Sequence, residues 1–389
     1  MRRILFLNTV LSGLLAAVLP AAAGPSLLLD TSSGQVIESQ DPFARWYPAS
    51  LTKLMTTYVV FRAVQSGEVT MESPVRMTKT AAKEPPSKMG YKPGTILTFD
   101  AALKIIMVKS ANDVAAAIGD SLAGSQAGFA ARMNAEAARL GMTGSHWVNA
   151  HGLHDDNQYT TARDLAVLAT ALRTEFPQYA SYFSIEGLAV DGKAIASHNT
   201  MIGRFEGADG MKTGYTCPSG FNLVASATRN GRTLMAVVIG ATSVASRAEQ
   251  AAGMLVRGFA FSPSTGGMSL KALTPPAGSP TQVTNMSDQL CSKEARAKLA
   301  KQEKERIAKD EDEDTVAAKK SIYLGQLTRP RQLVEIKLGG ASGPVPKGVA
   351  MALAAENRSD VPLPSWRPDL PPPAGAEPMI VQGDSASIQ

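Results

Sequence analysis

Ser50 and Lys53 stand three residues apart, and their side chain types could do chemistry together. The apolar residues that follow recur at helical spacing, so we expect a helix to begin at or near Ser50, just after Pro48. On that helix the two side chains share a face. An amine whose pKa is lowered by burial could take the proton of the serine hydroxyl, and the free N–H groups of the helix start could stabilise an oxyanion. The pair therefore predicts a serine nucleophile with a lysine base.

The spacing alone does not establish that chemistry. A serine followed three residues later by a lysine arises about once by chance in a chain of this length, usually as a helix cap with a surface lysine. The catalytic interpretation requires further polar groups that converge on Ser50.

A second polar pair, Ser110 and Asn112, lies between a helical segment that opens at Thr98 and an apolar segment that starts at Val114. Side chains two residues apart point the same way only in extended or loop-like backbone. A hydroxyl and an amide that converge on a cleft can pass a proton and hold a peptide carbonyl. In the alternative interpretation the pair only marks the boundary between two helices.

A third group, Lys212-Thr213-Gly214, lies on or beside the first of several predicted antiparallel strands. A lysine and a threonine hydroxyl at a strand edge can receive a carboxylate. Gly214 leaves space for an extended peptide to pair with the strand. As an isolated tripeptide, this sequence also occurs at strand ends that have no function.

Two histidines beside two aspartates, His151, His154, Asp155 and Asp156, invite a metal interpretation. No periodic helix holds the histidines as a pair, and no third cluster of histidine or cysteine accompanies them. We therefore expect a solvated loop, no metal site and no cofactor.

The first residues predict export. Residues 1–23 have a basic start, a short apolar stretch and an Ala-Ala-Ala end, which together are typical of a signal peptide cleaved near Ala23. An uncleaved membrane anchor is the alternative, and the short core with its small-residue end favours cleavage. Without Arg2 and Arg3 the formal charge of +5 falls to +3, and no basic stripe with aromatics appears, so nucleic acid is not an expected partner.

Cys217 and Cys291 are the two cysteines of the chain. In an exported protein they could form a disulfide, but the sequence leaves pairing and two separate thiols equally open.

The composition divides the chain into segments, with 44% hydrophobic and 19% charged residues overall. We expect a signal peptide at 1–23, a catalytic domain at 24–261, a linker at 262–290, a charged helix at 291–320, short strands at 321–338, and a Pro-rich unfolded tail at 339–389.

The order of the three motifs resembles that of the penicillin-binding proteins and serine β-lactamases. The stretches 46–57, 110–113 and 207–227 resemble the low-molecular-mass D-alanyl-D-alanine carboxypeptidases in particular. The similarity covers roughly residues 24–259. It implies an α/β (α+β) fold of the β-lactamase/transpeptidase type, in which helices flank an antiparallel sheet and a helical lobe lies across the cleft. The composition of the remaining chain predicts a largely irregular C-terminal extension.

The resemblance also implies roles for the reacting groups. Ser50 would be acylated, Lys53 would be its general base, and Ser110 would relay protons to the leaving amine. Backbone N–H groups of Ser50 and Tyr215 would form the oxyanion hole.

The substrate-binding roles follow in the same way. Asn112 would contact the substrate peptide, and Lys212 and Thr213 would bind the terminal D-alanine carboxylate or its β-lactam equivalent, beside Gly214. The implied reaction is acyl transfer from peptidoglycan stem peptides, without metal or organic cofactor, and β-lactams would be covalent inhibitors.

Two alternative functions stay open at this point. A D,D-endopeptidase that cuts peptidoglycan cross-links would use the same motifs, and a non-catalytic module would bind peptidoglycan or sense β-lactams but would have no need of Lys53. No segment matches the glutamate loop with which class A β-lactamases deacylate, so rapid lactam hydrolysis is not expected. The tail shows no apolar stripe with a basic face, which leaves membrane attachment open.

Overall fold

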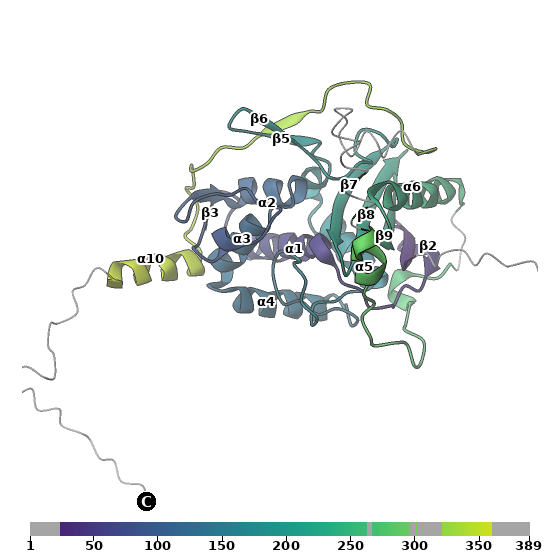
Figure 1. Ribbon diagram of the computed structural model, residues 1–389, viewed down its shortest axis with the longest axis horizontal. Coiled ribbons are helices and arrows are strands. Elements are labelled where there is room, and N and C mark those ends of the chain that lie inside the picture. Colours follow the sequence, from purple (N-terminus) through teal and green to yellow (C-terminus); the bar gives the residue numbers. More distant parts are fainter. Residues whose placement is uncertain (1–23, 263–266, 296, 298–300, 302–320, 360–389) are drawn as a thin grey trace, which may run out of the picture.

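A computed structural model of the protein describes residues 24–262, 267–295, 297, 301 and 321–359. Its centre is a five-stranded sheet in which all neighbouring strands are antiparallel (Figure 1). In order across the sheet, the strands are β2 (Gln35–Gln40), β1 (Ser26–Asp30), β9 (Arg232–Ala241), β8 (Gly220–Arg229) and β7 (Ala208–Thr216). Because β7 is an edge strand, its outer side can face the candidate site.

The sheet strands are buried on both faces. Leu27 and Leu29 belong to one hydrophobic core cluster, whereas Leu28 belongs to the other. In β9, Val237 and Val238 divide between the clusters in the same way. Successive strand residues point to opposite faces, so an uninterrupted apolar run fills both cores at once.

Helices cover both faces of the sheet. Helix α6 (Val244–Ala260) packs on one face and α5 (Ala162–Glu175) on the other. The helical lobe consists of α1 (Thr52–Gln65), α2 (Phe99–Val108), α3 (Asn112–Ala123) and α4 (Gln126–Arg139). The predicted α+β class is thereby confirmed.

Shorter elements complete the described structure. The strands are β3 (Pro74–Arg76), β4 (Ile96–Thr98), β5 (Gly187–Val190), β6 (Lys193–Ala196) and β10 (Leu333–Glu335). The 3-10 turns are Ala49–Leu51, Ala81–Lys83, Pro177–Phe183 and Leu270–Ala272, and the remaining helices are α7 (Ser287–Cys291) and α10 (Lys347–Ser359).

Local sequence signals set several boundaries. Asn230 and Gly231 both have positive φ, at 50° and 76°, as the tight hairpin between β8 and β9 requires. The hydroxyls of Thr98 and Thr161 each accept a backbone N–H bond at 3.1 Å and so cap α2 and α5. The predicted helix opening at Thr98 is confirmed.

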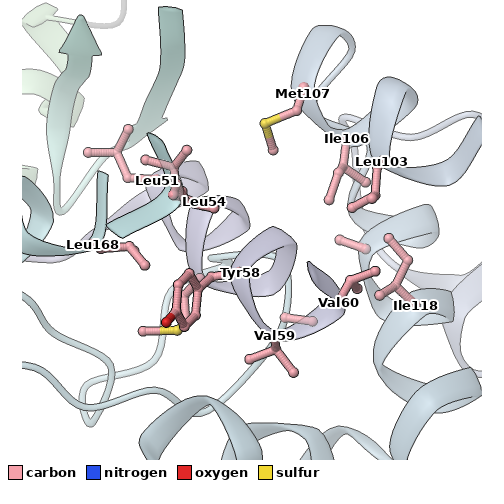
Figure 2. Close-up of a cluster of buried hydrophobic side chains, with 14 of the residues drawn as sticks. Leu51, Leu54, Tyr58, Val59, Val60, Leu103, Ile106, Met107, Ile118 and Leu168 are labelled. Atoms are coloured by element: carbon pink, nitrogen blue, oxygen red, sulfur yellow. The ribbon is translucent and has the colours of Figure 1, made fainter. Parts of the chain in front are cut away.

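Helix α1 is the centre of the larger core. Figure 2 shows its side chains Leu54 and Val60 pointing to opposite sides, toward Leu168 of α5 and toward Ile118 of α3 respectively. Leu54 and Val60 are both 0% exposed. A helix that is apolar all round is a buried helix, and this burial fixes where the residues at its start lie.

The predicted linker differs from the structure where it is described. Met286 and Leu290 are buried in the larger core, and Thr284 forms a β-bridge with Trp46. The segment therefore folds back onto the catalytic domain, because its few apolar residues find partners there. Cys217 and Cys291, whose relation the sequence left open, form a disulfide with a Cα–Cα distance of 5.8 Å.

The end of the described chain also differs from expectation. In place of several strands at 321–338, the structure has β10, which pairs with β5 in parallel. Residues 347–359 form α10 although an unfolded tail was predicted from 339 onward. Gly348 explains the docking of α10, since a Cβ there would lie 1.9 Å from the backbone oxygen of Asp120 in α3.

Several predicted segments cannot be compared with the fold. Residues 1–23, 360–389 and most of the charged helix at 291–320 lie outside the described residues. Within the described ranges, no helix combines the length and the apolar character that crossing a membrane requires.

The α1 core yields a test of stability. Leu54→Ala should lower the free energy of unfolding by about 2–5 kcal/mol, because it leaves a cavity in a fully packed site. Urea denaturation of the purified protein measures this change. Leu353→Ala on α10, where the side chain is 44% exposed, is the matched control and should change the free energy by less than about 0.5 kcal/mol. Equal losses in both variants would contradict the assignment of α1 to the core.

Candidate active site

Ser50 and Lys53 meet at the N-terminal end of α1. Ser50 lies in the 3-10 turn Ala49–Leu51, and Lys53 belongs to the first turn of the α-helix. The Lys53 Nζ donates a hydrogen bond to the Ser50 Oγ at 3.0 Å. The predicted sharing of one helix face is confirmed, with a 3-10 turn rather than an α-helical turn at the serine.

Close packing holds the backbone around Ser50 from two sides. Ala49 has a φ of 46°, in the left-handed region that residues with a Cβ rarely adopt. A Cβ on Gly152 would lie 1.9 Å from the Ala49 carbonyl oxygen, and a Cβ on Gly214 would lie 3.0 Å from the Ser50 backbone nitrogen. Strand β7 therefore passes directly beside the serine, and any side chain larger than that of glycine would be tightly packed at Gly214.

The amine of Lys53 is fully enclosed. Its side chain is 0% exposed, and its Nζ also donates to the Asn112 Oδ1 at 2.8 Å and to the His151 backbone oxygen at 2.6 Å. Burial, and next the positive charge of Lys212, lower the pKa of Lys53 well below its usual range, although nearby carboxylates act in the opposite direction. The arrangement favours the neutral amine, which is the form that can act as a base.

Ser110 lies between α2 and α3 and faces the second buried lysine. Its φ of 60° places it in the left-handed region, so the backbone there is loop-like as predicted. The Lys212 Nζ donates to the Ser110 Oγ at 3.0 Å and to the Thr213 backbone oxygen at 2.8 Å. The hydroxyl of the helical lobe is thus tied to β7 of the sheet.

Lys212 lies behind the cleft wall. Its side chain is 1% exposed, and burial together with the charge of Arg247 lowers the pKa of Lys212 to about 7. The sequence assigned Lys212 to carboxylate binding. The structure places its amine against Ser110, where it can influence the proton affinity of that hydroxyl, and its role in carboxylate binding stays a prediction.

Asn112 contributes to the lysine site. Its Oδ1 accepts from Lys53, and its Nδ2 donates to the Pro85 backbone oxygen at 3.0 Å. Next to it, the Asp113 carboxylate accepts the backbone N–H groups of Met89 and Gly90. The start of α3 therefore orients Lys53 and fixes the neighbouring loop, and the predicted contact of Asn112 with substrate stays a prediction.

A cleft of about 460 Å³ joins the two lobes at this point. Six of the eight residues selected from the sequence line it, namely Ser50, Ser110, Asn112, Thr213, Gly214 and Tyr215. Lys53 and Lys212 lie directly behind this wall, each bonded to one of the two serines. All three motifs therefore converge on a single cavity.

Sequence analysis missed Arg247 of α6. Arg247 is 5% exposed and lines the cleft, where its guanidinium donates to the Gly214 backbone oxygen at 3.5 Å and to the His198 backbone oxygen at 3.3 Å. The residue stands four positions before Ala251 and eight before Leu255, both buried. The sequence carried one signal of this position: Arg247 falls on the same face of the helix as these buried apolar residues, where an arginine is unusual.

The loop with His151 and His154 is only partly the solvated loop that we expected, because His151 packs beside Lys53. His151 is buried, its Nδ1 accepts from the Leu153 N–H at 3.1 Å, and burial followed by the charge of Lys53 lowers the pKa of His151 to about 3. The His154 Nε2 lies 3.3 Å from Asp156, apart from this site. Among the described residues, no three His, Cys, Asp or Glu side chains form a group that could hold a metal ion.

The low pKa of Lys212 has a consequence for stability. The unfolded chain keeps the lysine proton up to its ordinary pKa of 10.5, whereas the folded protein loses it near 7. The contribution of Lys212 to stability is therefore lowest below pH 7 and improves as the pH rises toward 10.5. Compared with the wild type, Lys212→Met should show its largest gain in unfolding free energy near pH 6–7, with a smaller gain near pH 9.5. Urea denaturation at these pH values measures the difference, and a gain that grows with pH would contradict the buried-amine assignment.

Comparisons with known proteins agree with this geometry. The sequence profile of the D-alanyl-D-alanine carboxypeptidase family matches residues 15–243. The D-alanyl-D-alanine carboxypeptidase DacD of Escherichia coli K12 is 35% identical over 265 residues, which cover 64% of this chain and 68% of DacD. The chain spans about 60–68% of the length of the first curated relatives that it matches.

Solved structures show the same fold. The D-alanyl-D-alanine carboxypeptidase DacD from Francisella tularensis superimposes with a TM-score of 0.60 and 25% identity, covering 67% of this chain and 74% of that one. Penicillin-binding protein D2 from Listeria monocytogenes, in its ampicillin-bound form, has a TM-score of 0.56 and 27% identity, covering 61% of this chain and 97% of that one. The chain thus belongs to the D-alanyl-D-alanine carboxypeptidase family of serine-type hydrolases.

Proposed function

We propose that the protein is an exported serine D-alanyl-D-alanine carboxypeptidase that removes the terminal D-alanine from peptidoglycan stem peptides through an acyl-enzyme on Ser50. The observation that carries the proposal is the 3.0 Å contact between the Ser50 hydroxyl and the fully buried amine of Lys53 in a cleft built by all three motifs. Family membership supplies the reaction class.

The hydrogen bonds of Lys53 explain how it activates the serine. The Asn112 Oδ1 and the His151 backbone oxygen can only accept hydrogen bonds, so they take the two N–H groups of a neutral amine. In the neutral amine the 3.0 Å bond with Ser50 therefore reverses its direction, and the lone pair of the amine accepts the proton of the Ser50 hydroxyl. As the Oγ attacks the D-alanine carbonyl, Lys53 receives that proton.

The backbone beside Ser50 suits the charge that develops on the attacked carbonyl. Ser50 lies at the start of a helix, and β7 passes so close that a Cβ on Gly214 would lie 3.0 Å from the Ser50 backbone nitrogen. We infer that the N–H groups of Ser50 and Tyr215 bind the oxyanion there. Ser110, bonded to Lys212, then passes a proton to the leaving amine, and water hydrolyses the acyl-enzyme.

Thr213 and Arg247 account for recognition of a free carboxyl terminus. Both line the cleft, and the guanidinium brings a permanent positive charge to it. Arg247 adds to the role that the sequence assigned to Lys212, whose amine is bonded to Ser110 in this structure. A β-lactam presents a carboxylate and a reactive carbonyl together, so it should acylate Ser50 in the same position.

Two observations support export. The residues before Gly24 have the pattern of a signal peptide. The Cys217–Cys291 disulfide is a bond that persists in oxidising compartments such as the periplasm. We therefore place the enzyme in the periplasm, cleaved near Ala23.

The function is tested with a peptide that ends in D-Ala-D-Ala. The purified protein should release D-alanine and be labelled by a fluorescent penicillin, and Ser50→Ala should lose both. Lys53→Arg keeps the positive charge but cannot act as a base, so it should slow acylation by about a hundred- to ten-thousand-fold. Penicillin labelling without D-alanine release would favour the endopeptidase or sensor function, and D-alanine release by Ser50→Ala would overturn the proposal.

The role of Arg247 is tested with paired substrates. Arg247→Ala should lower kcat/KM for the peptide acid by about ten- to a hundredfold, because a charge-assisted bond to the carboxylate is lost. The same peptide with a C-terminal amide lacks that charge and should be affected far less. Arg257→Ala is the control, since Arg257 lies on the same helix but is exposed and pairs with Glu38. Equal losses for acid and amide substrates would exclude carboxylate recognition by Arg247.

A further inference from the structure

Residues 284–291 follow the catalytic domain and contact two of its segments, the one that leads into Ser50 and the turn that follows β7. The Thr284 N–H donates to the Arg45 backbone oxygen at 3.1 Å, five residues before the nucleophile Ser50. The Met286 N–H donates to the Pro218 backbone oxygen at 2.9 Å, just beyond the end of β7. This segment, residues 284–291, is therefore attached to the approach to Ser50 and to the turn after Tyr215.

The same segment is seated in the protein core. Met286 is 6% exposed and Leu290 is 7% exposed, and both belong to the larger hydrophobic cluster. A Cβ on Gly220 would lie 2.6 Å from the Met286 sulfur, so the β7–β8 turn fits closely against it. Residues 284–291 are packed as a part of the catalytic domain.

The disulfide joins this segment to the strand that lines the cleft. Cys217 directly follows β7, and Cys291 ends α7. The Tyr215 hydroxyl lies 3.9 Å and 3.8 Å from the two sulfurs, and its ring stacks on Phe221 at a centroid distance of 4.2 Å. Tyr215 and Phe221 both line the cleft, so the disulfide supports its aromatic wall from behind.

The end of β7 depends on such support because it is an edge strand. It pairs with β8 on one side only. Other bonds hold the following turn, since the Thr216 N–H donates to the Ser219 hydroxyl at 2.9 Å and the Trp46 indole donates to the Ser219 backbone oxygen at 2.7 Å. Loss of the disulfide should therefore leave the fold intact while it frees Tyr215 to move.

We propose that the Cys217–Cys291 disulfide positions Tyr215 in the active site, so that the enzyme is fully active only while this bond is intact. The inference rests on the proposed function, because Tyr215 would supply an oxyanion N–H there. Reduction by a dithiol would remove this support of Tyr215. The dithiol gives two electrons and two protons to the disulfide, so the S–S bond breaks, two thiols form, and the dithiol becomes a disulfide.

The first experiment measures the full-length protein in oxidised, dithiothreitol-reduced and reoxidised form. Reduction should lower kcat for D-alanine release at least about fivefold, with a smaller change in KM, since an oxyanion donor acts in the transition state. Reoxidation should restore kcat. The double variant Cys217→Ser/Cys291→Ser should match the reduced protein and be insensitive to dithiothreitol. The control is Glu38→Gln. Glu38 lies on β2, the opposite edge strand of the sheet, and pairs with Arg257 of α6, so loss of this ion pair should leave kcat unchanged.

A second measurement does not depend on activity. Hydrogen exchange of backbone amides in residues 213–221 should speed up on reduction, whereas exchange in β1 and β2 should stay constant. A reduced, folded protein with unchanged kcat, or with unchanged exchange in residues 213–221, would overturn the proposal. If the oxidised protein releases no D-alanine, the proposed function fails, and the exchange measurement still decides whether the disulfide positions Tyr215.

Discussion

The burial of one amine is the constraint on which the candidate site depends. Lys53 reaches Ser50, Asn112 and the His151 backbone oxygen at once, and these three partners come from the 3-10 turn before α1, from α3 and from the loop before α5. A buried amine that lost one of these partners would keep an unsatisfied polar group in the core. The packing of three separate segments is thus tied to the chemistry of one side chain.

Lys212 is a second buried amine, and it contacts a serine as Lys53 does. Lys53 is bonded to Ser50 and Lys212 to Ser110, and each lysine lies behind the wall while its serine faces the cleft. The positive charge of Lys212 disfavours a proton on Lys53, and the positive charge of Arg247 disfavours a proton on Lys212, and both effects add to that of burial. Each serine is thus paired with an amine that is almost fully shielded from solvent, while the charged Arg247 lies on the cleft wall.

The candidate site residues could be predicted from sequence because they lie on strong local patterns. The apolar run after Ser50 marks α1, and the apolar segments around Ser110 mark the break between α2 and α3. Arg247 and the His151 backbone oxygen were not predicted, because their positions depend on tertiary packing. Arg247 lines the cleft because of how α6 packs on the sheet. The His151 carbonyl accepts from Lys53 because of how its loop packs beside α1. The chain after α6 was misjudged for the same reason. Its composition resembles a linker and a tail, yet Met286 and Val349 are buried against the catalytic domain.

The central claim is that Lys53 is held neutral so that it can serve as the base. Its protonation can be followed directly by NMR of the Cε signal in protein labelled at lysine, assigned by comparison with Lys53→Arg. Lys53 should titrate at a pH well below that of the exposed lysines, in keeping with its burial beside Lys212. A Lys53 that titrates together with the surface lysines, near a pKa of about 10.4, would contradict this claim.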